Sequence, residues 1–193
     1  MNRDEIRGKI VHICRKLVAY GLTYASLGNV SVRARDRVII TPSGIRFDEL
    51  VPQQLVVTDL NGKIIEGEKP SVELPMHLEI YRRIPDAGAI IHAHAPYATV
   101  YGTIMREIRF INEEARVFGV EYVPVCRYAP SGTRELAVYV AEALTNSKAV
   151  IIPNHGVVTY GRTLDESLRT LEVVENLSKM SIIKTILMKV LEE

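Results

Sequence analysis

The sequence predicts an α/β fold in which a sheet is sandwiched by helices. Two observations lead to this prediction. Stretches with the apolar spacing of an amphipathic helix alternate along the chain with short stretches rich in Val, Ile and Thr. In addition, Leu55 to Asp59 and Lys63 to Ile65 flank Asn61-Gly62, a strong signal for a β-hairpin. A hairpin joins antiparallel neighbours, so at least part of the sheet is expected to be antiparallel.

Length and composition are those of an ordinary soluble protein. The 193 residues contain no internal repeat, low-complexity tract or linker, so we expect one domain spanning residues 1–193. The formal net charge is +1 with no clustered Lys and Arg, which argues against nucleic acid as a partner. The charged N-terminus is not a signal peptide, and no apolar run is long enough for a membrane span. We therefore expect a cytoplasmic protein with no membrane partner.

The first half of the chain begins with a helix and continues with strands. Apolar residues from Arg3 to Tyr20 fall on one helical stripe, and Gly21 suits the end of that helix. Asn29 to Arg33 alternates as a strand does, and Arg37 to Thr41 is rich in β-branched residues. The Asn61-Gly62 hairpin follows them.

The second half alternates helices with strands. Ser71 can cap a helix that runs to about Arg83, with Pro75 tolerated in its first turn. Thr163 and Glu166 match a capping box at the start of a long C-terminal helix. Between them, strands are expected at 89–94, 120–125, 149–152 and 156–160, and helices at 96–105 and 133–144.

His92-Ala93-His94 is the sharpest local motif. Positions i and i+2 of a strand point to the same face, about 6.6 Å apart along the chain, so both imidazoles can bind one metal ion. Two histidines that merely form hydrogen bonds at a strand end are an equally good explanation of the motif alone.

Two further residues favour a metal site. His155 lies in the turn Pro-Asn-His-Gly, and Glu73 lies in the first turn of an expected helix. Three neutral imidazoles and one carboxylate are an ordinary ligand set for zinc. His77 lies one turn after Glu73, where it can support the site from behind, although a plain helix-surface histidine is the simpler interpretation. His12 is interpreted as a packing or solvent-facing residue of the first helix.

A second group of residues suits an anion. Small or polar residues beside turns or helix starts offer backbone N–H groups to a phosphate. They are Gly28, Asn29, Ser43, Gly44 and Ser71. Taken alone they are ordinary turn residues, but Ser71 lies two positions from Glu73, so a phosphate bound there would hold a small substrate near the metal.

Several stretches, taken together, resemble the class II aldolase/adducin family, and within it the branch that acts on fuculose 1-phosphate. They occur in the order and spacing of the family, over roughly residues 5 to 175. They are Leu27 to Ser31, Thr41 to Gly44, Pro70 to Glu73, His92 to Pro96, Gly132 to Leu136 and Asn154 to Val158.

This resemblance implies a three-layer α/β/α domain with a largely antiparallel, mixed central sheet. It implies a homotetramer with active sites at subunit interfaces, and zinc on His92, His94 and His155, with Mn²⁺ or Co²⁺ as alternatives. Glu73 would be a resting ligand that moves away to act as a base. Gly28, Asn29, Ser43, Gly44 and Ser71 would bind the phosphate of a small sugar phosphate. The implied reaction cleaves a ketose 1-phosphate into dihydroxyacetone phosphate and an aldehyde.

The sequence departs from the family pattern at three places. Val72 replaces a second serine of the phosphate site. The segment 111–114 has no tyrosine where the family takes a catalytic one from a neighbouring subunit, and Glu113 or Glu114 is an alternative proton donor there. No tyrosine follows Tyr160, whereas the fuculose-phosphate branch uses one in its C-terminal tail.

Other functions remain open on the sequence. A pentulose-phosphate 4-epimerase or a dehydratase of methylthioribulose phosphate would use the same histidines, although epimerases tend to have aspartate where Glu73 stands. A non-catalytic adducin-like module would not need the four ligands. An iron oxygenase of the cupin type fits least, because there the carboxylate follows the histidine pair within an all-β barrel.

Overall fold

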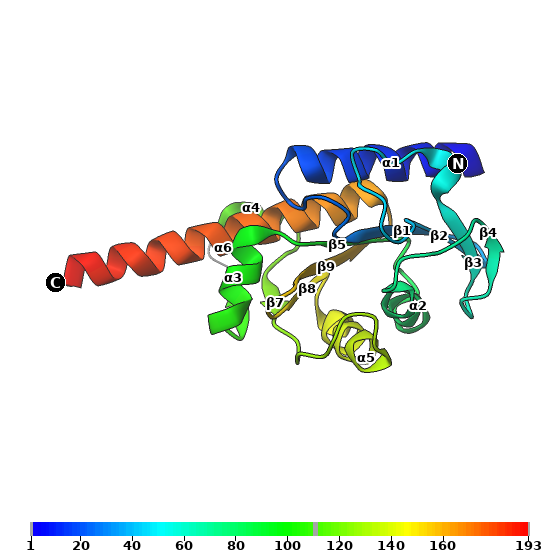
Figure 1. The fold of residues 1–193 in the computed structure, drawn as a ribbon. Helices are drawn as coiled ribbons and strands as arrows, with labels where there is room; N and C mark the ends of the chain where they lie inside the picture. The colour runs from blue at the N-terminus through cyan, green and yellow to red at the C-terminus, as the bar shows by residue number, and fades with distance from the viewer. Residues whose placement is uncertain (1, 110–111, 193) are drawn as a thin grey trace.

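The protein has three layers, with a sheet between two layers of helices (Figure 1). The computed structural model describes residues 2–109 and 112–192. In this part of the chain, seven strands form one sheet in the order β4-β3-β2-β1-β5-β9-β8. Their bounds are β1 (Asn29–Ala34), β2 (Arg37–Ile40), β3 (Val56–Asp59), β4 (Ile64–Glu66), β5 (Ala89–Ala93), β8 (Ala149–Ile152) and β9 (Gly156–Gly161).

All neighbouring strands of this sheet pair antiparallel. The described residues add one isolated parallel bridge, between Val125 and Ile151. The expected α/β/α layers and the largely antiparallel, mixed sheet are therefore confirmed.

Helices cover both faces of the sheet. Helices α1 (Arg3–Ala19) and α6 (Leu164–Glu192) lie on one face, and α2 (Leu74–Arg83) and α5 (Arg134–Ala143) lie on the other (Figure 1). Two separate apolar clusters fill the space between the layers. The remaining elements are α3 (Pro96–Ile104), α4 (Glu113–Val117), β6 (Glu107–Arg109), β7 (Tyr122–Pro124) and two short 3₁₀ helices, Pro52–Gln54 and Leu144–Asn146.

Strand alternation decides which face receives polar side chains. In β1, Val30 and Val32 belong to the cluster beneath α1 and α6. Asn29 and Ser31, at the intervening positions, face the α2 and α5 layer because successive side chains of a strand point to opposite faces. Both are almost completely buried. The α2 side of the sheet thus contains a polar region inside the fold.

The start of α2 differs from the expectation. Ser71 lies before the helix, and Glu73 occupies the N-cap position, although its side chain does not cap. The Ser71 hydroxyl accepts the backbone N–H of Glu73 at 3.3 Å, and the Ser71 carbonyl accepts the backbone N–H of Leu74 at 3.0 Å, which closes a turn that leads into the helix. Because the Glu73 side chain makes no cap hydrogen bond, it can point away from the helix axis.

The short elements β6, β7 and α4 differ from the expectation based on the sequence. β7 was expected as the longer strand 120–125, and it pairs with β6 in a separate two-stranded sheet. β6 and the short helix α4 were not expected, because three to five residues are too few to show a period. The hairpin at 55–65 forms as expected, but only Gly62 of its turn has a positive φ (87°).

The described helices include none that is both long enough and apolar enough to cross a lipid bilayer.

Candidate metal centre

His92 lies inside the sheet, one residue before the end of β5. Its cross-strand neighbours are Asn29 of β1 and Val158 of β9. The side chain is completely buried, and its Nδ1 lies 3.0 Å from the carbonyl oxygen of Val157. Because a carbonyl only accepts, Nδ1 carries a hydrogen, and Nε2 is the ring nitrogen that faces the other histidines.

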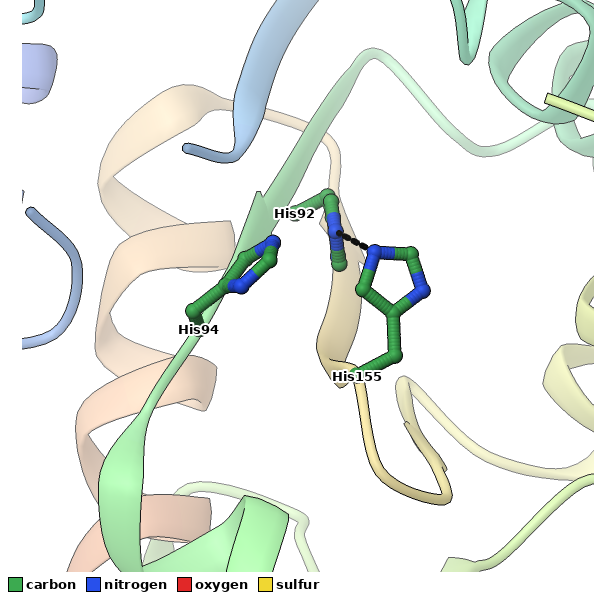
Figure 2. A group of neighbouring side chains, drawn as sticks. All are labelled: His92, His94 and His155. Atoms are coloured by element: carbon green, nitrogen blue, oxygen red, sulfur yellow. Dashed lines mark hydrogen bonds between the residues drawn. The ribbon is translucent and has the colours of Figure 1, made fainter. Parts of the chain in front are cut away.

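His94 and His155 converge on the same point from two segments (Figure 2). His94 follows the end of β5, and His155 lies in the turn between β8 and β9, where Asn154 has a φ of 60°. One ring nitrogen of each of the three histidines lies within 4.8 Å of the others. The expected meeting of His92, His94 and His155 is therefore seen in the structure.

Two glycines allow this close approach. A Cβ on Gly156 would lie 2.4 Å from the carbonyl oxygen of Ala93 and 3.1 Å from Cε1 of His92. Gly28 has a φ of 84°, and a Cβ there would lie 2.6 Å from the carbonyl oxygen of His92. Only glycine fits at either position without moving the backbone that carries the histidine.

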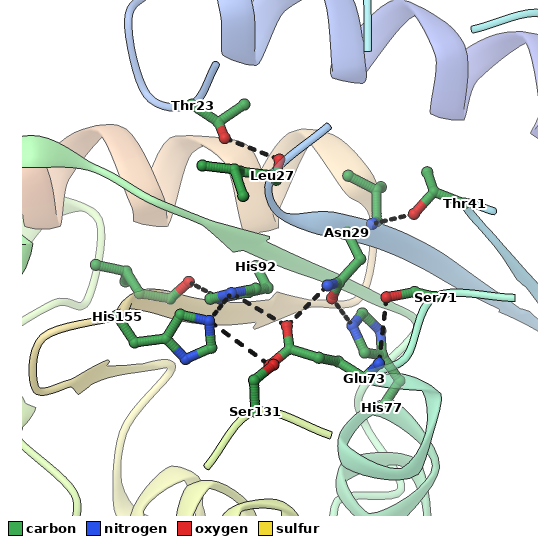
Figure 3. Close-up of polar contacts among 12 residues, drawn as sticks. Thr23, Leu27, Asn29, Thr41, Ser71, Glu73, His77, His92, Ser131 and His155 are labelled. Atoms are coloured by element: carbon green, nitrogen blue, oxygen red, sulfur yellow. Dashed lines mark hydrogen bonds and ion pairs between the residues drawn. The ribbon is translucent and has the colours of Figure 1, made fainter. Parts of the chain in front are cut away.

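Glu73 reaches the histidines from the start of α2 (Figure 3). Its Oε2 lies 3.2 Å from Nε2 of His92, and its Oε1 lies 3.7 Å from Nε2 of His155. Each carboxylate oxygen also accepts a hydrogen bond of 2.9 Å, from Asn29 Nδ2 to Oε2 and from Ser131 Oγ to Oε1. Glu73 is only 3% exposed.

The surroundings favour the ionised form of this carboxylate and the neutral forms of His94 and His155. Burial raises the pKa of Glu73, but His92, the Asn29 hydrogen bond, His155 and Ser131 outweigh it and lower the pKa to about 2. Burial, followed by the charge of His92, lowers the pKa of His94 to about 3 and that of His155 to about 4. Neutral imidazoles and an ionised carboxylate are the forms that bind a metal ion.

The donor set fits a divalent metal ion. His92 Nε2 lies 3.2 Å from a carboxylate oxygen and 3.3 Å from Nε2 of His155. A divalent cation placed among these nitrogen and oxygen atoms would be attracted by the carboxylate charge and by the ring lone pairs. Three ligands bound to zinc at about 2.0–2.1 Å lie roughly 3–3.5 Å apart, a spacing that the His92–His155 pair already has. Nitrogen and oxygen donors of this kind suit zinc, and also manganese or cobalt.

The residues expected to bind phosphate gather around Thr41, beside the centre. The Thr41 hydroxyl accepts the N–H of Val30, next to Asn29, and the Thr41 carbonyl accepts the N–H of Ser71. Ser43 follows two residues later, and Gly44, with a φ of 79°, has open space above it. Gly28 precedes Asn29 directly. These segments are thus neighbours, although the side-chain amide of Asn29 is already bonded to Glu73.

Glu113 and Glu114 lie elsewhere. Both are exposed in the first turn of α4, whose N-cap is Asn112. In residues 2–109 and 112–192, no hydrogen bond or ion pair joins either side chain to Glu73 or to the three histidines. Residue 111, which belongs to the segment where the family has its tyrosine, lies outside the described residues.

Two residues of the centre were not identified from the sequence. Ser131, which binds Glu73, lies in the loop before α5, where Gly132 approaches the Val72 carbonyl; the motif from Gly132 begins one residue too late to include it. His77 was interpreted as a helix-surface histidine, and this is wrong: its ring is completely buried and hydrogen-bonded to Asn29. The i, i+4 spacing from Glu73 was the available signal. His12, in contrast, is exposed on α1.

Comparisons with known proteins show the family of this chain. Residues 8–182 match the family model described as the class II aldolase and adducin N-terminal domain. The chain belongs to this family.

Three similar proteins indicate which members of the family this chain resembles. An L-fuculose phosphate aldolase of Haemophilus influenzae is 35% identical over 178 residues, which is 92% of this chain and 82% of the relative. A 5-methylthioribulose-1-phosphate/5-deoxyribulose-1-phosphate aldolase of Rhodospirillum rubrum is 33% identical over 178 residues, covering 92% of this chain and 80% of the relative. A solved structure of an L-fuculose 1-phosphate aldolase is 36% identical and superposes with a TM-score of 0.89, over 95% of this chain and 87% of that one. The family and these relatives support a lyase.

Proposed function

We propose that this protein is a metal-dependent aldolase that reversibly cleaves a ketose 1-phosphate, similar to L-fuculose 1-phosphate, into dihydroxyacetone phosphate and an aldehyde. The observation that carries the proposal is the meeting of three imidazole nitrogens beside a buried carboxylate whose pKa is lowered to about 2. Burying a charge costs free energy unless the charge is compensated. A non-catalytic module would have no need for a buried carboxylate at this place.

His92, His94 and His155 would hold the metal, and Glu73 would be a further ligand at rest. Zinc is the proposed ion, and manganese or cobalt is the alternative. When bound, the divalent ion supplies a Lewis acid that stabilises negative charge on the substrate oxygens. The hydrogen bond from His92 Nδ1 to Val157 keeps the ring in the tautomer that binds a metal through Nε2.

The loops around Thr41 hold the phosphate group. Backbone N–H groups near Gly28 and Gly44, the hydroxyls of Ser43 and Ser71, and the second amide hydrogen of Asn29 are its proposed donors. Asn29 and Ser71 contact Glu73, so a phosphate bound there would leave the reacting carbons of a short substrate near the carboxylate. This supports a small phosphorylated sugar as the substrate.

Glu73 transfers the proton at the carbon that becomes part of dihydroxyacetone phosphate. With a pKa of about 2, the carboxylate at rest suits a ligand better than a base. Moving away from His92, His155 and Ser131 removes interactions that favour the ionised form, so the basicity of Glu73 rises. The proposed motion off the metal therefore also activates the base.

The proposed assembly is a homotetramer with active sites between subunits. Glu113 and Glu114 are exposed on α4, so as proton donors for the aldehyde product they would act at the site of a neighbouring subunit. Whether Glu113 or Glu114 acts as a proton donor would then depend on how the subunits pack against one another.

The relatives support two narrower substrate classes, fuculose 1-phosphate and 5-deoxypentulose 1-phosphates, named for the Haemophilus and Rhodospirillum proteins. A 4-epimerase or a dehydratase on the same scaffold is the alternative chemistry. Purified protein should be analysed for bound metal and then incubated with each ketose 1-phosphate. Release of dihydroxyacetone phosphate that stops with chelator and returns with zinc is expected. An epimerised or dehydrated product without triose phosphate would replace the aldolase proposal, and a metal-free, inactive protein would favour an adducin-like module.

A further inference from the structure

A line of buried polar side chains leads from Glu73 away from the metal centre, between β1 and α2. Asn29 Nδ2 donates to Glu73 at 2.9 Å, and Asn29 Oδ1 is hydrogen-bonded to Nε2 of His77 (Figure 3). On the other side of the ring, His77 Nδ1 lies 2.6 Å from Ser31 Oγ. Ser31 Oγ in turn lies 2.8 Å from the hydroxyl of Tyr81.

None of these groups has access to solvent. The exposed fractions are 0% for His77 and Ser31, 2% for Tyr81 and 3% for Asn29. A buried polar group costs free energy unless its hydrogen bonds are made, and an apolar core would avoid the cost entirely. The line also ends on the carboxylate that contacts the metal ligands, rather than within a separate structural cluster.

The direction of every hydrogen bond in the line follows from its end. The Glu73 carboxylate only accepts, so Asn29 must turn its NH₂ toward Glu73 and its oxygen toward His77. The Asn29 oxygen only accepts, so His77 carries its hydrogen on Nε2 and presents a lone pair on Nδ1. Ser31 then donates to Nδ1, and Tyr81 donates to the free lone pair of Ser31.

We propose that His77 is a positioning residue for Glu73, because its Nε2–H fixes the flip state of the Asn29 amide. Ser31 and Tyr81 hold His77 in the required tautomer. This inference rests on the proposed role of Glu73. In the opposite flip state, the Asn29 oxygen would face the Glu73 carboxylate, and the two acceptors would repel each other.

Asn29 is also connected to a proposed metal ligand, His92, through the sheet. Asn29 is the cross-strand partner of His92, so its backbone cannot shift without disturbing β5. The side-chain amide is therefore held at both ends, by strand pairing and by His77. A Glu73 carboxylate that moves during turnover would therefore return to a donor whose orientation has not changed.

The tautomer of His77 is a direct test that does not depend on activity. Long-range ¹H–¹⁵N correlation spectra of the metal-free protein, labelled with ¹⁵N-histidine, distinguish the two neutral forms and the charged form. The His77 signals are assigned by their loss in the His77→Leu variant. We expect neutral His77 with its hydrogen on Nε2. A hydrogen on Nδ1, or a charged ring at pH 7, would overturn the proposal.

Substitutions then test the effect on turnover. His77→Leu should lower kcat about 10- to 100-fold, the usual loss for groups that orient a metal-site ligand, with little change in KM. His77→Gln keeps a nitrogen donor near the position of Nε2 and should restore most of the loss. His12→Gln, on the exposed face of α1, is the matched control and should have the kcat of the unaltered protein.

The outcomes separate this inference from the proposed function. Equal losses in His77→Leu and His77→Gln, with metal content and melting temperature retained, would contradict the positioning role. An unaltered protein that cleaves no ketose phosphate would contradict the proposed function, whereas the tautomer measurement would still decide the orientation of Asn29.

Discussion

Single atoms decide the chemistry of the centre. Nε2 of His92 faces a carboxylate oxygen and a second imidazole nitrogen, and its own ring hydrogen is used on the opposite side by Val157. Glu73 lies against His92 and His155 and accepts hydrogen bonds from Asn29 and Ser131. Replacing Glu73 therefore changes the charge of the centre as well as its contacts.

The first prediction concerns the charge of Glu73. Glu73→Gln preserves the shape of the side chain and removes its charge and basicity. We expect the fold and the histidines to be retained while kcat falls by about 10²–10⁴-fold, the usual contribution of a general base. Release of dihydroxyacetone phosphate measures turnover, and elemental analysis controls for metal content. Near-normal turnover would exclude Glu73 as the base.

The second prediction concerns pH and the metal-free protein. Burial lowers the pKa of His77 to about 3 from an unfolded value of 6.5, so the unfolded chain binds one more proton between these values. The free energy of unfolding should therefore fall as the pH drops below 6.5, by about 1.4 kcal/mol per pH unit for each such histidine. Above pH 6.5 this contribution is fully present.

Urea denaturation between pH 7 and pH 4.5 measures this dependence. His94 and His155, whose pKa values are also lowered by burial, add to the slope. In His77→Gln the slope should be smaller by the contribution of one histidine. The same slope in both proteins would show that His77 is not neutral and buried in solution.

At the scale of elements, the centre lies where neighbouring strands end. β5 delivers His92 and His94, the β8–β9 turn delivers His155, and α2 begins at Glu73. Backbone is packed against backbone here, because Gly156 and Gly28 have no Cβ to separate the strand ends. Small changes in the turns should therefore act on the metal ligands.

The third prediction tests this close packing. Gly156→Ala would place a Cβ 2.4 Å from the Ala93 carbonyl oxygen, so the turn carrying His155 must move. We expect destabilisation of about 1–3 kcal/mol, typical of overpacking, together with weaker zinc binding. Gly8→Ala is the control: nothing lies within 4 Å of the added methyl group on α1, and helix propensity predicts a gain of roughly 0.5–1 kcal/mol. Unchanged zinc affinity in Gly156→Ala would contradict the prediction.

At the scale of the molecule, one metal ion would connect segments more than 80 residues apart, from Glu73 to His155. The fourth prediction is that zinc stabilises the folded protein. Saturation at 100 times the dissociation constant should add about 2.7 kcal/mol, which raises the melting temperature. His92→Ala should abolish the shift. An equal shift in that variant would place zinc elsewhere.

The far half of α6 bears on the proposed assembly. The helix runs past the rest of the molecule toward the C-terminus (Figure 1). It exposes a row of apolar side chains, Ile183, Ile186, Leu187, Val190 and Leu191. Large exposed apolar areas commonly mark interfaces. In the proposed homo-oligomer, a second copy of the chain would cover this row of side chains.

The fifth prediction follows from this surface. Ile186→Glu combined with Leu187→Glu should reduce the mass measured by light scattering from that of a tetramer to that of a smaller species. Lys184→Glu changes charge on the same half of α6 without removing apolar area, and should leave the mass unchanged. A monomeric unaltered protein would remove the tetramer, and with it any role of Glu113 or Glu114 in a neighbouring site.

Much of the fold was readable from local patterns. The helix at Arg3, the strands around Asn29 and Val38 and the hairpin at Gly62 were predicted because period and turn chemistry are local properties. The histidine pair was equally local, since a strand places His92 and His94 on one face. Elements of three to five residues, such as β6 and α4, carry no measurable period and were missed.

The sequence by itself determined the residue types of the centre, the alternation that turns them inward, and the family to which the chain belongs. Only the tertiary structure decided which donors complete it. The i, i+4 spacing placed His77 beside Glu73 on a helix face, but whether that face meets solvent or the sheet depends on packing. Burial against β1 makes His77 a partner of Asn29, and the loop before α5 brings Ser131 to Glu73. These contacts join residues distant in the chain, so no local pattern encodes them.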